Sequence, residues 1–241
     1  MDPINAIASP LAGTPVLSQF WRGLVFVHWR VDPAEIAPLL PEGIVPDVFD
    51  GATWVGLIPF EMRDSAVLGG LAIPYFGSFT EVNVRLYGMD RDGHRGVVFR
   101  SLEASRLAAV LVARTLFSLP YVWASASVER SDDVVTYRSR RLAPGRPASL
   151  VSVRTSAVEV VDDPLADFLT ARWLLFVRRG AHTLSMPNEH ASWQLFRADL
   201  LELDDDLVAA AGIASVGGRA PDSVLYSPGV VTRFGRPTRL A

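Results

Sequence analysis

The chain has 241 residues, a formal net charge of −3 and a hydrophobic fraction of 49%, the ordinary balance of a soluble globular protein. It contains no cysteine and no lysine, so arginine is its only strongly basic side chain. This composition excludes disulfides, thiolate metal sites and lysine nucleophiles. The acidic balance also argues against nucleic-acid binding, which needs a basic surface.

Targeting signals are not evident in the sequence. No run approaches the roughly 18–20 apolar residues that a membrane helix needs, and residues 1–18 lack the pattern of a secretion signal. We expect a cytoplasmic protein without nucleic-acid or membrane partners. A small-molecule substrate or ligand is the expected partner, and a homo-oligomer is left open. Residues 1–18 are predicted to form a flexible arm, and residues 19–241 a single domain.

Most of the chain carries strand patterns, either alternating apolar and polar residues or runs of β-branched and aromatic residues. Strands are predicted over residues 24–30, 53–60, 79–87, 97–102, 121–129, 134–140, 149–161, 193–201 and 224–234. Turn residues at 90–93 and 131–133 predict two hairpins.

Three helices are predicted between these strands. Asp32 followed by Pro33 indicates a helix start, and this short helix ends near residues 41–43. Residues 104–118 have apolar side chains at helical spacing, and residues 164–173 form the third helix. Strands outnumber helices without a βαβ rhythm, so the predicted fold is mainly β: an antiparallel barrel or strongly curved sheet with a few packed helices.

The segment 79–87 is the most informative for function. Strand alternation places Glu81, Asn83 and Arg85 on one face, with Phe79 and Tyr87 at its two ends. In an open sheet this face would meet solvent, and a Glu–Arg pair there would contribute well under about 1 kcal/mol. In a closed barrel it would line an interior, where carboxylate pKa values shift into a useful range. The aromatic ends favour the interior.

Other candidate residues are more isolated. Tyr121 follows Pro120 at a strand start, where its hydroxyl could donate to a developing oxyanion. Arg22 precedes the first strand, and His190 lies three residues before Trp193. The four histidines show no metal-binding spacing, and no tight His/Asp/Glu cluster is evident, so no metal is expected. Phosphate-loop, dinucleotide and Gly-x-Ser-x-Gly motifs are missing from the sequence, and no cofactor is expected.

Several motifs together are similar to a known family. They are Trp21-Arg22-Gly23, Leu40-Pro41-Glu42-Gly43, residues 81–87 (EVNVRLY), residues 116–121 (LFSLPY), residues 137–141 (YRSRR), residues 169–173 (LTARW) and residues 226–230 (YSPGV). In this order and spacing the chain, from about residue 19, resembles the YqjF-like branch of the acetoacetate-decarboxylase-like superfamily, a domain family of unknown function. The resemblance implies a cone-shaped, mostly antiparallel β-barrel with an enclosed pocket.

The resemblance also implies where a pocket would lie. In the decarboxylases the pocket holds an arginine, a glutamate and a nucleophilic lysine. The segment from Arg22 to Pro41-Glu42 is similar to the one that carries the arginine, and Glu81 is similar to the glutamate. Tyr121 occupies the place of the lysine. Decarboxylation by that route needs an amine for the iminium intermediate, so the resemblance does not carry this activity to a lysine-free chain.

We therefore expect a cofactor-independent enzyme of the lyase or isomerase type, acting on a small carbonyl or carboxylate compound by enolisation, dehydration, aldol-type addition or cyclisation. The catalytic residues would be Glu81, Tyr121 and Arg85, and the substrate-binding residues Arg22, Asn83, His190 and Tyr226. The alternative is a non-catalytic small-molecule binder in which Arg85 neutralises Glu81. A third reading is an interaction module in which the two residues form a surface pair.

Overall fold

The computed structural model describes residues 4–67, 78–107, 110–111, 114–115, 118–142 and 145–240. Strands dominate these residues, which confirms the mainly-β class. The strands are β1 (Leu17–Val31), β2 (Ile44–Pro46), β3 (Thr53–Val67), β4 (Phe79–Asp90), β5 (Arg95–Ala104), β6 (Tyr121–Ser131), β7 (Val134–Arg141), β8 (Ala148–Glu159), β9 (Leu174–Arg179), β10 (His182–Glu189), β11 (Phe196–Asp205), β12 (Ser223–Phe234) and β13 (Thr238–Arg239). The helices are α1 (Pro33–Ile36), η1 (Ala37–Leu39), α3 (Pro164–Thr170), α4 (Leu207–Ala210) and η2 (Ala214–Val216).

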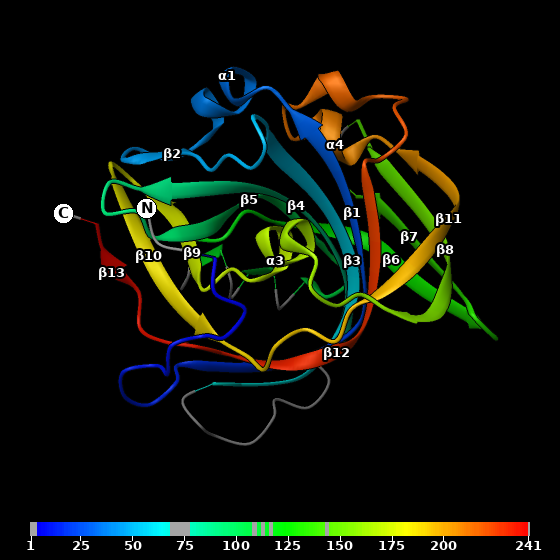
Figure 1. Cartoon of the computed structure of the whole chain (residues 1–241), viewed down its shortest axis with the longest axis horizontal. Helices are drawn as coiled ribbons and strands as arrows, with labels where there is room; N and C mark the ends of the chain where they lie inside the picture. The colour runs from blue at the N-terminus through cyan, green and yellow to red at the C-terminus, as the bar shows by residue number, and fades with distance from the viewer. Residues whose placement is uncertain are drawn as a thin grey trace.

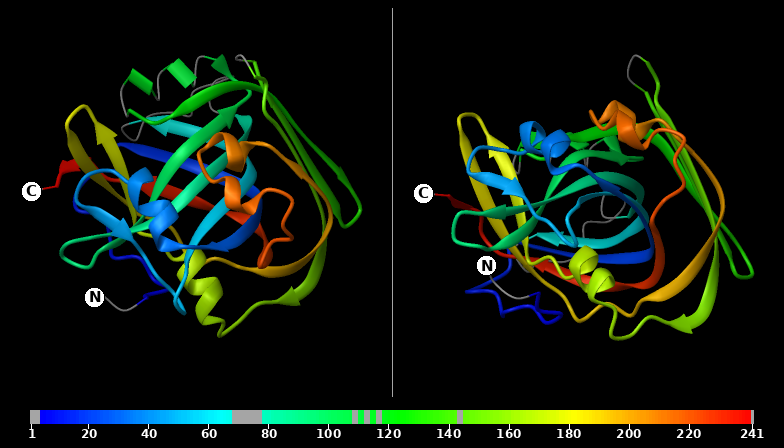
Figure 2. Two further views of the ribbon diagram at one scale, coloured as in Figure 1. Left: turned by 90° about the horizontal axis from the view of Figure 1, so that it is seen from above. Right: turned by 45° about the horizontal axis from the view of Figure 1, so that its top comes forward.

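The described strands form one sheet in the order β13-β10-β9-β5-β6-β7-β8-β11-β12-β1-β3-β4-β2 (Figure 1). Two further pairings join β10 to β12 and β5 to β4. Neighbouring strands are antiparallel except where β5 pairs with β6 and β9. The sheet is strongly curved, and β6, β7, β8 and β11 extend to the side away from β9 and β10 (Figure 2). The cone-shaped barrel stays a prediction.

Local sequence signals account for many of these elements. Asp32 accepts a hydrogen bond from the Ala34 backbone N–H, and Pro33 is the first residue of α1, as its sequence predicts. The predicted hairpins are confirmed as the antiparallel pairs β4–β5 and β6–β7. The predicted 164–173 helix is shorter, because α3 ends at Thr170 and β9 begins at Leu174.

Some elements differ from the prediction. β9 and β10 fill residues 174–189, for which the sequence had predicted no element. The helix predicted over 104–118 lies partly outside the described residues, and Leu107, Val110 and Leu111 in its described part are helical. The glycine-rich loop around residues 69–70 also lies outside them. Leu17 and Ser18, assigned to the arm, belong to β1, whereas the flexibility of the arm stays a prediction.

Strand β4 separates two different environments. Val82, Val84 and Leu86 face a large hydrophobic cluster that also includes Val135 and Val153. The alternate residues of β4 face the other way, toward α3. Figure 1 shows α3 near the centre of the view, within a frame of strands that includes β10, β12 and β1. The polar row of β4 is therefore buried and not exposed on an open sheet, and its Arg85 and Tyr87 contact α3.

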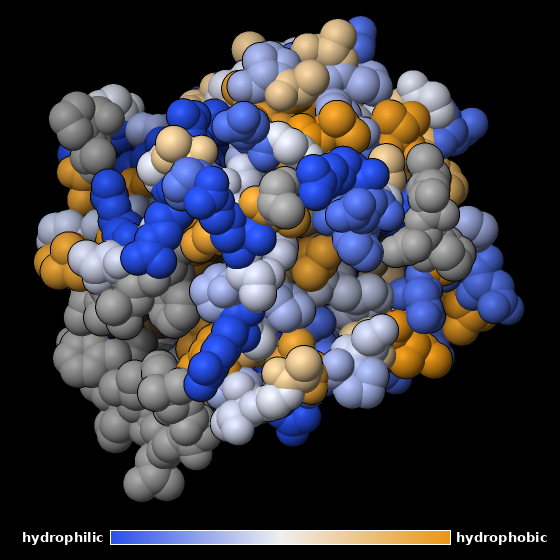
Figure 3. All heavy atoms as spheres, turned by 90° about the vertical axis from the view of Figure 1, so that its left-hand side faces the viewer, coloured by the Kyte–Doolittle hydropathy of each residue, from blue (hydrophilic) through white to orange (hydrophobic). Residues whose placement is uncertain are grey.

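On the side of β10 and β13, hydrophilic and hydrophobic residues are interspersed (Figure 3). Within the described part of the chain, no helix has the length and apolar character required to cross a membrane.

Candidate functional site

Glu81 lies at the centre of the first part of the site. It is 1% exposed, and its Oε2 accepts a hydrogen bond of 2.7 Å from the Tyr121 hydroxyl. Parallel pairing of β5 with β6 sets Tyr121 beside Leu102, two positions before Ala104, the residue that pairs with Glu81. Asn83 donates a longer bond of 3.5 Å to Glu81 Oε1. The sheet thus joins three residues that the sequence predicted as site residues.

Burial controls the protonation of this pair. Removal from water raises the pKa of Glu81 to about 7, although the hydrogen bonds from Tyr121 and Asn83 lower it. Burial and the adjacent Glu81 charge raise the pKa of Tyr121 well above its usual range. Near neutral pH the carboxyl group therefore populates both of its forms while the phenol stays protonated. A group with these properties can take up and return a proton.

A second buried glutamate, Glu103, provides a contrast. It pairs in register with Val82, so its side chain lies on the face of the sheet opposite to Glu81. Arg141 Nε donates to its carboxylate at 2.8 Å, and the Ser101 hydroxyl does so at 3.3 Å. Glu103 is thus held as an ion pair. Sequence reasoning did not identify this residue, whose partner lies 38 positions away.

The other end of the β4 row is occupied by Arg85 and Tyr87. Arg85 Nε donates to the Tyr87 hydroxyl at 2.9 Å, and its terminal nitrogen donates to the Leu169 carbonyl of α3 at 2.9 Å. The Tyr87 hydroxyl also donates to Leu169, at 3.1 Å. Arg85 therefore contacts neutral groups, and the Glu81–Arg85 pair of the alternative hypothesis is not formed.

His28 of β1 completes this end of the row. Its Nε2 lies 2.6 Å from the Tyr87 hydroxyl, and because that hydroxyl donates to Leu169, Nε2 is the donor. Burial, followed by the Arg85 charge, lowers the pKa of His28 well below its usual range, so the ring is neutral. Gly56 lies between the two side chains: a Cβ there would be 2.9 Å from His28 Nε2 and 3.3 Å from Arg85 Cγ. The glycine thus makes room for both.

A buried ion-pair cluster lies behind Tyr87. Arg172 hydrogen-bonds to Asp47, and Arg95 donates to the same carboxylate at 2.6 Å. The Arg172 guanidinium lies 4.9 Å from the Tyr87 ring centre and 4.2 Å from that of Phe168. This cluster holds the aromatic side chains around Tyr87 in place. Sequence reasoning did not identify it. The sequence did carry a signal for two other residues at this end of the row, His28 and Tyr87, because each continues the alternation of side chains along its strand.

The remaining predicted residues lie apart from Glu81. Arg22 is exposed on β1, and Tyr226 is half-buried and packs against the hydrophobic cluster on the other face of β4. His190 lies between Trp173 and Trp193, with ring centres 4.5 and 4.7 Å away. Burial and then the charge of Arg85 lower the pKa of His190 to about 4, which places this ring within electrostatic reach of Arg85. The binding roles of these residues stay predictions.

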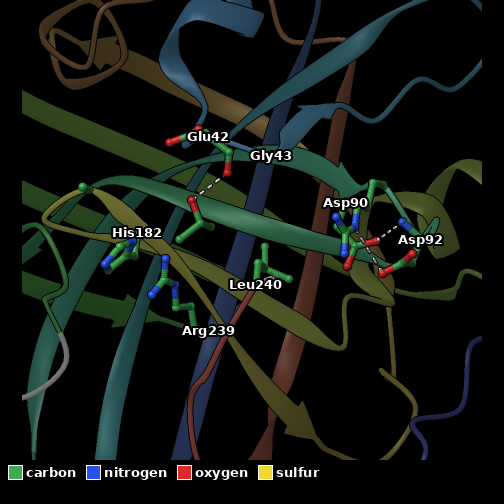
Figure 4. A pocket seen from close by; sticks show the side chains of 10 residues that line it. Glu42, Gly43, Asp90, Asp92, His182, Arg239 and Leu240 are labelled. Carbon is green, nitrogen blue, oxygen red and sulfur yellow. Dashed lines mark hydrogen bonds and ion pairs between the residues drawn. The ribbon is translucent and has the colours of Figure 1, made fainter.

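A separate surface cavity of about 440 Å³ lies near the β4–β5 turn (Figure 4). Asp90, Asp92 and His94 stand beside it with ligand atoms within 4.8 Å of one another, a cluster that sequence reasoning overlooked. Asp90 Oδ1 accepts from the backbone N–H groups of Asp92 and His94, and Oδ2 contacts His94 Nδ1 at 3.0 Å. These hydrogen bonds stabilise the turn, and this structural role explains why the three residues lie together.

Comparison with known proteins assigns this chain to a family. Residues 18–231 match the DUF2071 family, described as an uncharacterized conserved protein. The chain belongs to the DUF2071 family. It is 30% identical over 189 residues, 78% of each chain, to the uncharacterized protein YqjF of Bacillus subtilis strain 168. The resemblance to the YqjF-like branch is thereby confirmed.

Solved structures show the wider fold of this DUF2071 chain. An acetoacetate decarboxylase from Legionella pneumophila superposes with a TM-score of 0.70 at 13% identity, over 97% of this chain and 92% of that one. An acetoacetate decarboxylase-like enzyme from Sphingomonas wittichii gives 0.68 at 15%, over 95% and 94%. The enduracididine biosynthesis enzyme MppR gives 0.64 at 16%, over 95% and 89%. At these identities the likeness establishes the fold and leaves the reaction open.

Proposed function

We propose that this protein is an enzyme that moves protons on a small carbonyl compound, with Glu81 as the acid–base group. The observation that carries the proposal is the isolated buried carboxyl of Glu81, bonded to Tyr121 and unpaired with any cation among the described residues. Structural carboxylates of this chain, such as Glu103 and Asp47, are neutralised by arginine. A buried carboxyl without a counter-ion is unstable as an anion and therefore reactive as a base.

The proposed step begins with the ionised form of Glu81. Its carboxylate removes the proton from the carbon beside the substrate carbonyl, and the electron pair of the C–H bond becomes that of the enolate. Tyr121 is the donor to the enolate oxygen, because its hydroxyl turns from Glu81 Oε2 as that group becomes protonated. Protonated Glu81 then returns the proton to the substrate. Enolisation is the common first step of isomerisation, dehydration and aldol-type addition.

The proposal assigns no role to a Schiff base. The sequence has no lysine side chain, and Tyr121 stands where the resemblance to the decarboxylases would place one. The enzymes that share the fold include an acetoacetate decarboxylase and MppR, which has been solved in complex with pyruvate, and both support carbonyl chemistry without identifying the reaction here. A non-catalytic binder in which Arg85 neutralises Glu81 is disfavoured, since Arg85 bonds to Tyr87 and Leu169 instead.

Proton NMR in deuterated buffer tests the proposal. We expect the protein to replace α-protons of an oxo acid by deuterium at a rate proportional to protein concentration. Glu81→Gln keeps the shape and the Tyr121 hydrogen bond but cannot accept the proton, so exchange should fall at least about 100-fold. Glu159→Gln, at an exposed position, is the matched control and should exchange as the wild type does. Unchanged exchange in Glu81→Gln would contradict the assignment.

A further inference from the structure

Arg85 differs from the other buried arginine of the chain. Among the described residues, Arg85 and Arg172 are the two arginines with less than a tenth of their surface exposed, at 8% and 4%. Arg172 is paired with Asp47, whereas Arg85 has no carboxylate within ion-pair distance in the described ranges. The ranges outside them contain one acidic side chain, Asp2. A guanidinium keeps its charge under burial, so this cation is uncompensated.

Two further polar atoms near Arg85 also lack partners. Asn83 Oδ1 and His28 Nδ1 are buried without a hydrogen bond in the described structure. Asn83 shares the face of Glu81 and Arg85, and His28 pairs in register with Gly56, which pairs with Arg85. Buried polar groups are rarely left unpaired, so neighbouring positions of β4 and β1 hold a cation that lacks an anion and two acceptors that lack donors. The cation calls for an anionic group on the ligand, and the two acceptors call for a hydroxyl group or a water molecule. We propose that Arg85 binds the carboxylate of an extended oxo acid, whose carbonyl group lies beside Glu81.

The ligand charge follows from the cations present. Arg85 supplies one positive charge, and its neighbour His28 is held neutral by burial. A single guanidinium with two parallel N–H donors matches a carboxylate, whereas a phosphate dianion would need more positive charge. Phe26, whose ring centre lies 5.5 Å from the Arg85 guanidinium, adds an apolar wall suited to a carbon chain.

The ligand length follows from the register. Arg85 contacts Tyr87 and lies beside Gly56 and His28, so its guanidinium stays at its own level of the sheet, four residues from Glu81. Four strand residues span about 13 Å. Allowing a hydrogen-bond distance of about 3 Å at each end leaves about 7 Å for the ligand. At roughly 1.3 Å of extension per bond, the carboxylate and carbonyl carbons are separated by about five or six bonds.

This inference rests on the proposed function only for the end of the ligand that lies beside Glu81. The test is a series of linear methyl-ketone acids that lengthens by one methylene at a time, from pyruvate to an oxo-decanoate. Binding is measured by ligand line broadening and calorimetry, and exchange by deuterium incorporation. We expect affinity and exchange to peak at about five or six bonds, with pyruvate at least about tenfold weaker.

Variants and a neutral ligand separate the two ends of the site. Arg85→Gln should weaken the best acid by about 10- to 100-fold, and Arg140→Gln, at an exposed position of β7, should not. The methyl ester of that acid should bind the wild type as weakly as the acid binds Arg85→Gln. The ester comparison uses the wild-type protein and so holds even where the variant fails to fold.

The outcomes distinguish this inference from the proposed function. A length optimum and an ester penalty without deuterium exchange would support the anion site and contradict the acid–base role of Glu81. Deuterium exchange that does not depend on chain length or on esterification would support the acid–base role of Glu81 and contradict the anion site. Wild-type protein that binds no member of the series would overturn the anion site.

Discussion

Two sets of buried charges in this protein differ in how they are compensated. Asp47 lies between Arg172 and Arg95, and Glu103 is held by Arg141, so each carboxylate has a cation from another element. Glu81 and Arg85 share one strand face, are both buried, and have neutral partners instead. The comparison shows that this sequence can pair buried charges and does not do so along β4. Uncompensated buried charge in a defined row supports the ligand site proposed above.

The largest expected effect comes from breaking a compensated pair. Asp47→Asn leaves Arg172 buried without a counter-ion, which should lower the free energy of unfolding by about 3–5 kcal/mol. Arg85→Gln removes a cation that has no counter-ion and should change stability by less than about 1 kcal/mol. Urea denaturation of both variants checks this. Equal losses would mean that Arg85 is compensated after all.

The second expected effect is a pH-dependent stability from Glu81. Because burial raises its folded-state pKa from 4.5 to about 7, the folded protein binds more protons than the unfolded chain between these values. Stability therefore falls as pH rises through that window, by roughly 3 kcal/mol for this group.

Glu81→Gln does not titrate, so it isolates this contribution. The variant should gain roughly 3 kcal/mol over the wild type between pH 4 and pH 8, and thermal melts at several pH values check it. A difference that is independent of pH would show that Glu81 is ionised normally in the folded state.

The smallest expected effect concerns the hydrogen bond between Tyr121 and Glu81. This bond lowers the pKa of Glu81, so Tyr121→Phe should raise that pKa further and cost about 1 kcal/mol of stability. Carbon NMR of the glutamate carboxyl groups measures the titration. Tyr226→Phe, in the cluster on the other face, should leave it unchanged, and a lower pKa in Tyr121→Phe would contradict the geometry.

Sequence predicted the polar row of β4 well for a physical reason. Strand alternation fixes which side chains share a face, and three polar residues between apolar ones stand out in a strand buried on both sides. It could not predict partners set by tertiary contact, such as the Leu169 carbonyl or Asp47. β9 and β10 were missed because six residues ending in two arginines and a segment containing Pro187 are weak strand signals. Asp90, Asp92 and His94 are brought together by a turn whose folding the spacing alone does not reveal.

Gly56 has a consequence for how this family can diverge. A methyl group there would meet His28 and Arg85 at once, so the residues that these three positions can hold depend on one another. Replacing the glycine by alanine therefore requires the side chain at position 28 or 85 to move or to be shortened. Among relatives, glycine at this position should accompany the histidine–arginine pair.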